Sequence, residues 1–178
     1  MQVWLRHGTK LFANGKGYYG YHQHDPPLTK DAKEDVEAKV VRLMEMSIPS
    51  VIRSSPFLRC RTTALYIQKE LEKRGYAVPI EIDVKLGEFL GFQKPKGRLA
   101  DVTRETRSYY RPILGTESLY DFNFRVNEYM YLHSRDENVW YVTHGLFIST
   151  VYKTLTGENI RLDALEGFIS KDGGYERI

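Results

Sequence analysis

The sequence has one cysteine, little net charge and no long apolar run. With Cys60 alone, no internal disulfide bond can form, and such scarcity favours a reducing compartment. No apolar stretch is long enough to cross a bilayer, and Met1 leads into the first expected strand without a basic and apolar leader. We therefore expect an unprocessed, cytoplasmic protein that does not enter membranes. The net charge of +3 is too small to indicate nucleic-acid binding by itself.

The composition is that of an ordinary globular protein. Hydrophobic residues make up 42% of the chain and charged residues 28%, and 178 residues suffice for one domain with a sizeable core. We expect residues 1–178 to form a single domain, with a basic and aromatic loop or lid insertion at about 88–115. Neither composition nor sequence pattern indicates an oligomeric state.

Strand patterns alternate with helix patterns along the chain. We expect strands at 2–6, 50–54, 79–86 and 138–143, and helices at 28–46, 56–74, 117–133 and 145–155. This alternation is typical of an α/β protein whose mainly parallel central sheet is covered by helices on both faces, a three-layer sandwich.

Two of these strands end in a histidine followed by a glycine. His7 follows the apolar residues 3–5 near the N-terminus, and His144 follows residues 139–142 near the C-terminus. In α/β sheets the carboxyl ends of parallel strands carry the chemistry. Both histidines are therefore candidate functional residues.

A third strand end turns into a helix that we expect to bind an anion. Ser55 is a suitable N-cap, and Pro56 fits the first helical position, where its missing N–H costs nothing. Arg59 would then lie in the first turn, where helix N–H groups and the helix dipole favour negative charge. This pattern predicts a phosphate-sized site.

Together these segments resemble the histidine phosphatase superfamily, which includes the cofactor-dependent phosphoglycerate mutases. The matching segments occur in the family's order and lie at residues 6–8, 25–29, 54–64, 86–88, 115–126 and 143–145. The resemblance implies a phosphoglycerate mutase-like fold. Gly145 stands where the acid-phosphatase branch carries an aspartate, so the chain resembles the other branch.

The residue types fit phosphoryl transfer. A neutral imidazole can attack phosphorus, and nearby guanidinium groups disfavour its protonation, so His7 is the expected nucleophile. Arg6 and Arg59 suit the phosphoryl oxygens, and His144 would donate to the same oxygens. Glu88 occupies the position at which the family carries its proton donor, and the same carboxylate could then activate the hydrolytic water.

Three functions stay open on sequence grounds. The favoured one is a metal-independent phosphatase that hydrolyses phosphomonoesters through phosphohistidine, acting on a small phosphorylated substrate or a phosphoprotein. The residues Leu86 to Phe89, together with residues 25–29, resemble a subgroup that includes phosphotyrosine phosphatases, although other anionic phosphoesters remain open. The alternatives are a phosphoglycerate mutase-type phosphotransferase, for which the chain looks short, and a non-catalytic interaction module that retains the fold.

We expect neither a metal nor a cofactor. His22 and His24 could suggest metal ligands, but no further histidine or cysteine cluster in the sequence completes a shell. The sequence departs from the family pattern after the first motif. Thr9 and Lys10 follow Gly8, whereas many family members have glutamate or glutamine next. This departure bears on detailed substrate contacts.

Overall fold

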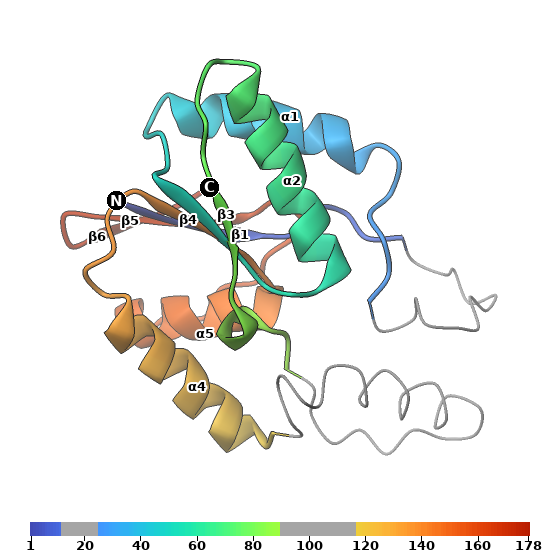
Figure 1. The fold of residues 1–178 in the computed structure, drawn as a ribbon. Coiled ribbons are helices and arrows are strands. Elements are labelled where there is room, and N and C mark those ends of the chain that lie inside the picture. Colours follow the sequence, from blue (N-terminus) through green and yellow to red (C-terminus); the bar gives the residue numbers. More distant parts are fainter. Residues whose placement is uncertain (12–24, 90–116) are drawn as a thin grey trace, which may run out of the picture.

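The computed structural model describes residues 1–11, 25–89 and 117–178 (Figure 1). Its six strands form one sheet in the order β3-β2-β4-β1-β5-β6. The strands are β1 (Gln2–Arg6), β2 (Val51–Ser54), β3 (Ile80–Ile82), β4 (Val139–Thr143), β5 (Gly167–Lys171) and β6 (Gly174–Arg177). The helices are α1 (Ala32–Met44), α2 (Leu58–Glu72), α4 (Leu119–Leu132) and α5 (Gly145–Thr156), with a short 3₁₀ helix, η2 (Val84–Leu86).

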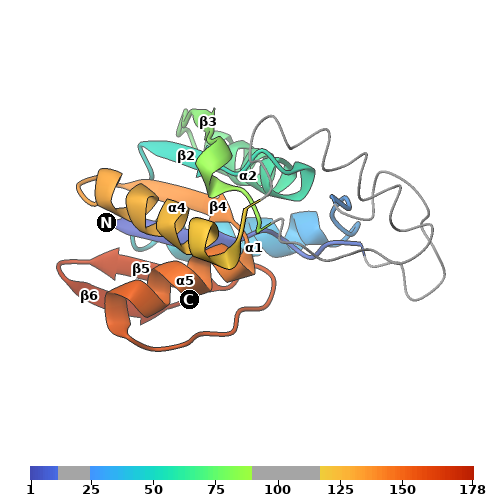
Figure 2. The same ribbon diagram turned by 90° about the horizontal axis from the view of Figure 1, so that it is seen from below.

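The helices cover both faces of the sheet. Figure 1 shows α1 and α2 above the sheet and α4 and α5 below it, and in Figure 2, seen from below, α4 and α5 lie in front of the sheet. Strands β3, β2, β4 and β1 are parallel, whereas β5 and β6 are antiparallel to their neighbours. The expected α/β class, with a mainly parallel sheet between helical layers, is confirmed.

Side-chain alternation along β1 divides the interior into two cores. Val3 and Leu5 belong to the cluster under α1 and α2, whereas Trp4 belongs to the cluster under α4 and α5. Trp4 stacks on Tyr141 of β4 with ring centroids 4.0 Å apart. Because β4 lies between β2 and β1 and is buried along its whole length, the strand that leads to His144 is firmly held.

Three expected elements have clearly different bounds. The helix expected at 28–46 is shorter and covers only α1, from Ala32 to Met44. The strand expected at 79–86 covers only β3, because the Asp83 carboxylate accepts a hydrogen bond from the Lys85 N–H (2.9 Å) and starts η2. The helix expected at 56–74 begins at Leu58, so Pro56 is not its first residue. Phe57 is the N-cap, with an extended backbone and no side-chain cap of its own, so the prediction of Ser55 as N-cap was wrong.

The C-terminal hairpin of β5 and β6 was not expected, although the sequence carries a signal for it. Asp172 and Gly173 join the strands with φ angles of 51° and 78°, which is the left-handed backbone that an Asp-Gly hairpin turn requires. At the start of β5, a Cβ on Gly167 would lie 1.7 Å from the Trp4 carbonyl oxygen. The absence of a side chain there lets β5 pair closely with β1.

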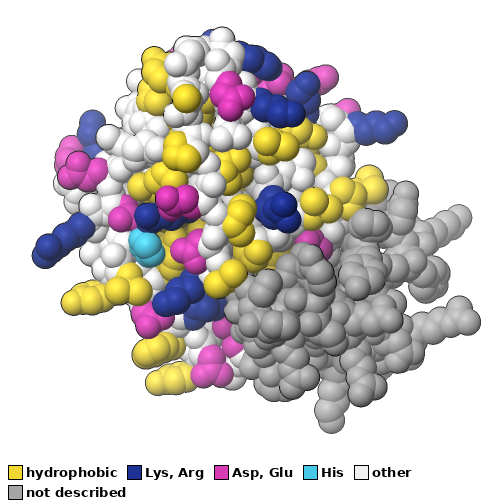
Figure 3. Space-filling model, viewed as in Figure 1, with side chains coloured by type: hydrophobic (Ala, Val, Ile, Leu, Met, Phe, Trp, Pro, Cys, Tyr) yellow, Lys and Arg dark blue, Asp and Glu magenta, His cyan; other side chains and the backbone are white. Residues whose placement is uncertain are grey.

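The face seen in Figure 3 interleaves basic, acidic and hydrophobic side chains over the part of the surface that is coloured, in keeping with the small net charge. Within the described ranges, no helix is long and apolar enough to cross a membrane. Only the first two positions of the insertion expected at 88–115 are among the described residues. His22 and His24 also lie outside the described residues.

Candidate active site

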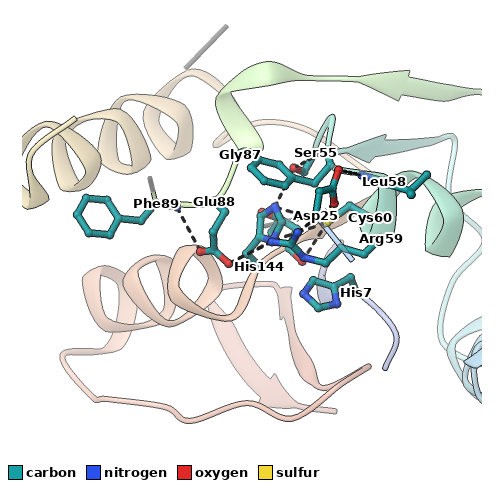
Figure 4. A network of polar contacts seen from close by, with 12 residues as sticks. His7, Asp25, Ser55, Leu58, Arg59, Cys60, Gly87, Glu88, Phe89 and His144 are labelled. Atoms are coloured by element: carbon teal, nitrogen blue, oxygen red, sulfur yellow. Dashed lines mark hydrogen bonds and ion pairs between the residues drawn. The ribbon is translucent and has the colours of Figure 1, made fainter. Parts of the chain in front are cut away.

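Three parallel strands bring the predicted site residues to one edge of the sheet. In the register of β1, β4 and β2, Arg6 pairs with Thr143, and Ser54 pairs with Val142. The residues that follow these strand ends therefore lie together, as Figure 4 shows for His7 and His144. Their ring centroids are 5.6 Å apart.

His7 is held as a neutral imidazole in one tautomer. Its ring is 2% exposed, and Nδ1 lies 2.8 Å from the Gly8 carbonyl oxygen. A carbonyl only accepts hydrogen bonds, so Nδ1 carries the proton and Nε2 carries the lone pair. Burial, together with the positive charge of Arg59, lowers the pKa of His7 from 6.5 to about 3. The ring is therefore uncharged at neutral pH.

Arg59 lies at the centre of the charged groups. It is 3% exposed in the first turn of α2, and its Nη1 donates to Asp25 Oδ1 at 3.1 Å. On the other side, its Nη2 lies 3.0 Å from His144 Nδ1 and 3.6 Å from Glu88 Oε2. The guanidinium thus links the carboxylates of the site to its second histidine.

Asp25 is a site residue to which sequence reasoning gave no role. Its Oδ2 accepts the Leu58 N–H (2.7 Å), so the carboxylate caps α2 from a distant segment and also holds Arg59. A carboxylate at the positive end of a helix dipole is favourable. The only sequence signal for this residue was its place in the family-like segment 25–29.

His144 is completely buried at the N-cap of α5. Because Arg59 only donates, Nδ1 accepts from it and Nε2–H donates to Ser55 Oγ (2.9 Å). Burial and the Arg59 charge hold the pKa of His144 well below its usual range. The sequence predicted that His144 donates a hydrogen bond to a phosphoryl oxygen. It could do so only if Nδ1 carried a proton.

Glu88 follows η2 and points toward the same cluster (Figure 4). Its Oε2 lies 3.3 Å from His144 Nδ1, and its Oε1 accepts the Phe89 N–H at 3.2 Å. Burial raises the pKa of Glu88, and the Arg59 charge opposes that increase. The side chain keeps 29% of its surface exposed, so it remains open to a reacting group.

Arg6 and Lys10 add positive charge beside His7. Arg6 lies against Gly145, where an added Cβ would be 3.4 Å from its Nε, and it donates through Nη1 to the Leu162 carbonyl oxygen. Arg6 Nε is buried without a hydrogen-bond partner in the described part of the chain. Burial and the charges of Arg59 and Arg6 lower the pKa of Lys10, which sequence analysis had singled out only as a departure.

The arrangement joins a neutral imidazole with a free lone pair to a buried guanidinium and a carboxyl group of raised pKa. The profile of the histidine phosphatase superfamily (branch 1) matches residues 3–169, so the chain belongs to this family. The family implies a phosphorylated substrate. No functionally curated protein matches the sequence significantly.

Several solved structures share the fold of this chain. A putative α-ribazole-5′-phosphate phosphatase from Escherichia coli has a TM-score of 0.66 at 20% identity, covering 99% of this chain and 94% of the other. Phosphoglycerate mutase from Bacillus anthracis has a TM-score of 0.67 at 20% identity, covering 99% and 90%. A mycobacterial glucosyl-3-phosphoglycerate phosphatase has a TM-score of 0.62 at 19% identity, covering 99% and 96%. At these identities the similarity establishes the fold.

Proposed function

We propose that the protein is a phosphomonoesterase that works through a phosphohistidine on His7. The observation that carries this proposal is the tautomer of His7, because the Nδ1–H···O=C bond to Gly8 places the lone pair on Nε2. A neutral imidazole with a lowered pKa is a competent nucleophile without a separate base. No metal takes part in the proposed reaction.

In the first half-reaction, His7 Nε2 attacks phosphorus and the bond from phosphorus to the ester oxygen breaks. In its protonated form, which burial favours, Glu88 gives its proton to the leaving oxygen. Arg6 and Arg59 would bind the phosphoryl oxygens, on which negative charge is concentrated. His144 is neutral in the free protein; it would donate to the same oxygens once the bound anion, by favouring the charged imidazole, leads to protonation of Nδ1.

In the second half-reaction, water attacks the phosphorus of phospho-His7. Glu88, now a carboxylate, takes a proton from that water as the P–N bond breaks and inorganic phosphate forms. The same residue thus acts first as acid and then as base, which restores the starting state.

Aryl phosphates such as phosphotyrosine, or other anionic phosphoesters, are the substrates that we propose. The positive charges of Arg6, Lys10 and Arg59 all act on His7 and would attract such anions. A small phosphorylated molecule and a phosphoprotein both meet this requirement.

The test is to trap the intermediate. The protein is incubated with ³²P-labelled substrate in EDTA and quenched in alkali, in which phosphohistidine survives and phosphoserine esters do not. We expect labelled wild type, no label on His7→Asn, and normal labelling of His133→Asn, a matched histidine loss outside the site. Label that persists on folded His7→Asn, or a folded wild type that turns over no phosphomonoester, would refute the proposal.

A further inference from the structure

The backbone that leads to Glu88 is held by a side chain from α4. Arg125 Nη1 donates to the carbonyl oxygens of both Lys85 and Gly87, the latter at 3.1 Å. These two carbonyls flank the end of η2, immediately before the proposed acid. A guanidinium has its donors in a fixed plane, so two acceptors on one nitrogen fix the direction in which this segment leaves η2.

The carbonyl between them is held by a side chain from β4. Thr143 Oγ1, at the end of β4, donates to the Leu86 carbonyl oxygen at 2.6 Å. Thr143 is completely buried and directly precedes His144. Three consecutive carbonyls before Glu88 therefore receive side-chain hydrogen bonds, and one of the donors belongs to the strand that carries the second histidine.

Arg125 is itself fixed. Glu117 accepts hydrogen bonds from Arg125 Nε (3.0 Å) and Nη2, in the paired geometry of guanidinium and carboxylate. The two side chains are only 14% and 8% exposed, and the guanidinium carbon lies 5.0 Å from the Phe122 ring centroid. A buried ion pair that is joined by two hydrogen bonds holds its geometry far better than an exposed ion pair.

We propose that Arg125 and Thr143 are positioning residues for Glu88, which orient its carboxyl group for proton transfer to the leaving oxygen. This inference rests on the proposed function and adds two residues to it. Neither residue touches the reacting atoms. Their effect comes through the backbone of residues 85–87, and a misplacement of about 1 Å in a reacting group can reduce the rate roughly 100-fold.

A second contact between the same elements provides the matched control. Lys85 Nζ pairs with Glu128 Oε2 at 3.0 Å, also joining η2 to α4, but both side chains are more than 40% exposed. This pair does not engage the carbonyls. Glu128→Gln therefore breaks a link between η2 and α4 without releasing the backbone before Glu88.

The experiment compares kcat/KM for two substrates that differ in their need for an acid. The leaving group of p-nitrophenyl phosphate departs readily without a proton, whereas that of phenyl phosphate depends on one. Both substrates are measured on each enzyme preparation, so their ratio does not depend on how much of the variant is folded. Glu88→Gln defines the full loss of the acid.

We expect Arg125→Gln and Thr143→Val to reduce kcat/KM for phenyl phosphate at least about tenfold more than for p-nitrophenyl phosphate, in the direction set by Glu88→Gln. Thr143→Ser, which keeps the hydroxyl, and Glu128→Gln should retain the wild-type ratio. Equal losses on both substrates in Arg125→Gln and Thr143→Val, with a clear split in Glu88→Gln, would overturn the positioning role alone. A Glu88→Gln enzyme without any split would overturn the acid role in the proposed function and this inference with it.

Discussion

The depressed pKa of His7 predicts that the folded protein loses stability when it is acidified. A base with a lowered pKa in the folded state binds fewer protons than the same group in the unfolded chain. The stabilising contribution of neutral His7 is therefore complete above the ordinary pKa of 6.5 and is lost as the pH falls from there toward about 3. Replacing His7 by asparagine should remove this part of the pH dependence.

The magnitude follows from the two pKa values. Between pH 7.5 and pH 5, the unfolded chain takes up nearly a full proton at this site while folded His7 stays neutral, which corresponds to about 2 kcal/mol of lost stability. Because the ring is only 2% exposed, solvent screening does not diminish this value. The pKa of His144 is also lowered, so this residue too makes the folded protein less stable on acidification. The raised pKa of Glu88 has the opposite effect and makes the folded protein more stable as the pH falls.

The assay is urea unfolding of wild type and His7→Asn at pH 7.5, 6.5, 5.5 and 5. The contributions of His144 and Glu88 are present in both proteins, so the difference between the two curves isolates His7. An asparagine amide can still donate to the Gly8 carbonyl, which limits structural change. We expect the difference in unfolding free energy to change by about 2 kcal/mol in favour of the variant between pH 7.5 and 5. Parallel pH profiles would refute the assignment of a buried, neutral His7.

Three further changes have defined outcomes. Glu88→Gln should lower kcat/KM for phenyl phosphate about 100-fold, because the leaving oxygen loses its proton donor. In a pH–rate profile, the wild type should lose activity as the pH rises through the raised pKa of Glu88, and the variant should not show this decline. Asp25→Asn should destabilise the protein by about 2 kcal/mol, because Arg59 loses a buried charged partner; an unchanged free energy of urea unfolding would contradict this. Gly167→Ala should lower the midpoint of thermal unfolding sharply, since its Cβ would collide with the Trp4 carbonyl oxygen, and an unaltered midpoint would show that β5 can shift freely.

The sequence predicted the layers of the fold and where its site residues would meet, because these depend on local patterns. Apolar runs of strand length that end in His7 or His144 identify strand ends, and parallel strands end at the same edge of a sheet. The position of Arg59 in the first turn of a helix was predicted from residue type and spacing. These inferences need only short segments and the general geometry of α/β sheets.

Contacts between distant segments could not be predicted in this way. Ser55 has the residue type of an N-cap, but its hydroxyl is used by His144, and α2 is capped instead by Asp25. The two bonds from Arg125 to backbone carbonyls, likewise, leave no pattern in the segment that receives them. The C-terminal hairpin is different, since its Asp172-Gly173 turn is a local signal that the sequence itself carries.

The position of β4 in the sheet has a consequence for biosynthesis. Strands β1 and β2 are made first, yet they do not pair with each other, because β4 lies between them and Gln2 pairs with Val139. Until residues 139–143 leave the ribosome, both early strands keep an edge without its final partner, and such edges invite pairing with other chains. The last of the parallel strands also leads directly to His144, so the parallel part of the sheet and the edge that holds both histidines are completed in the same step, before β5 and β6 are added.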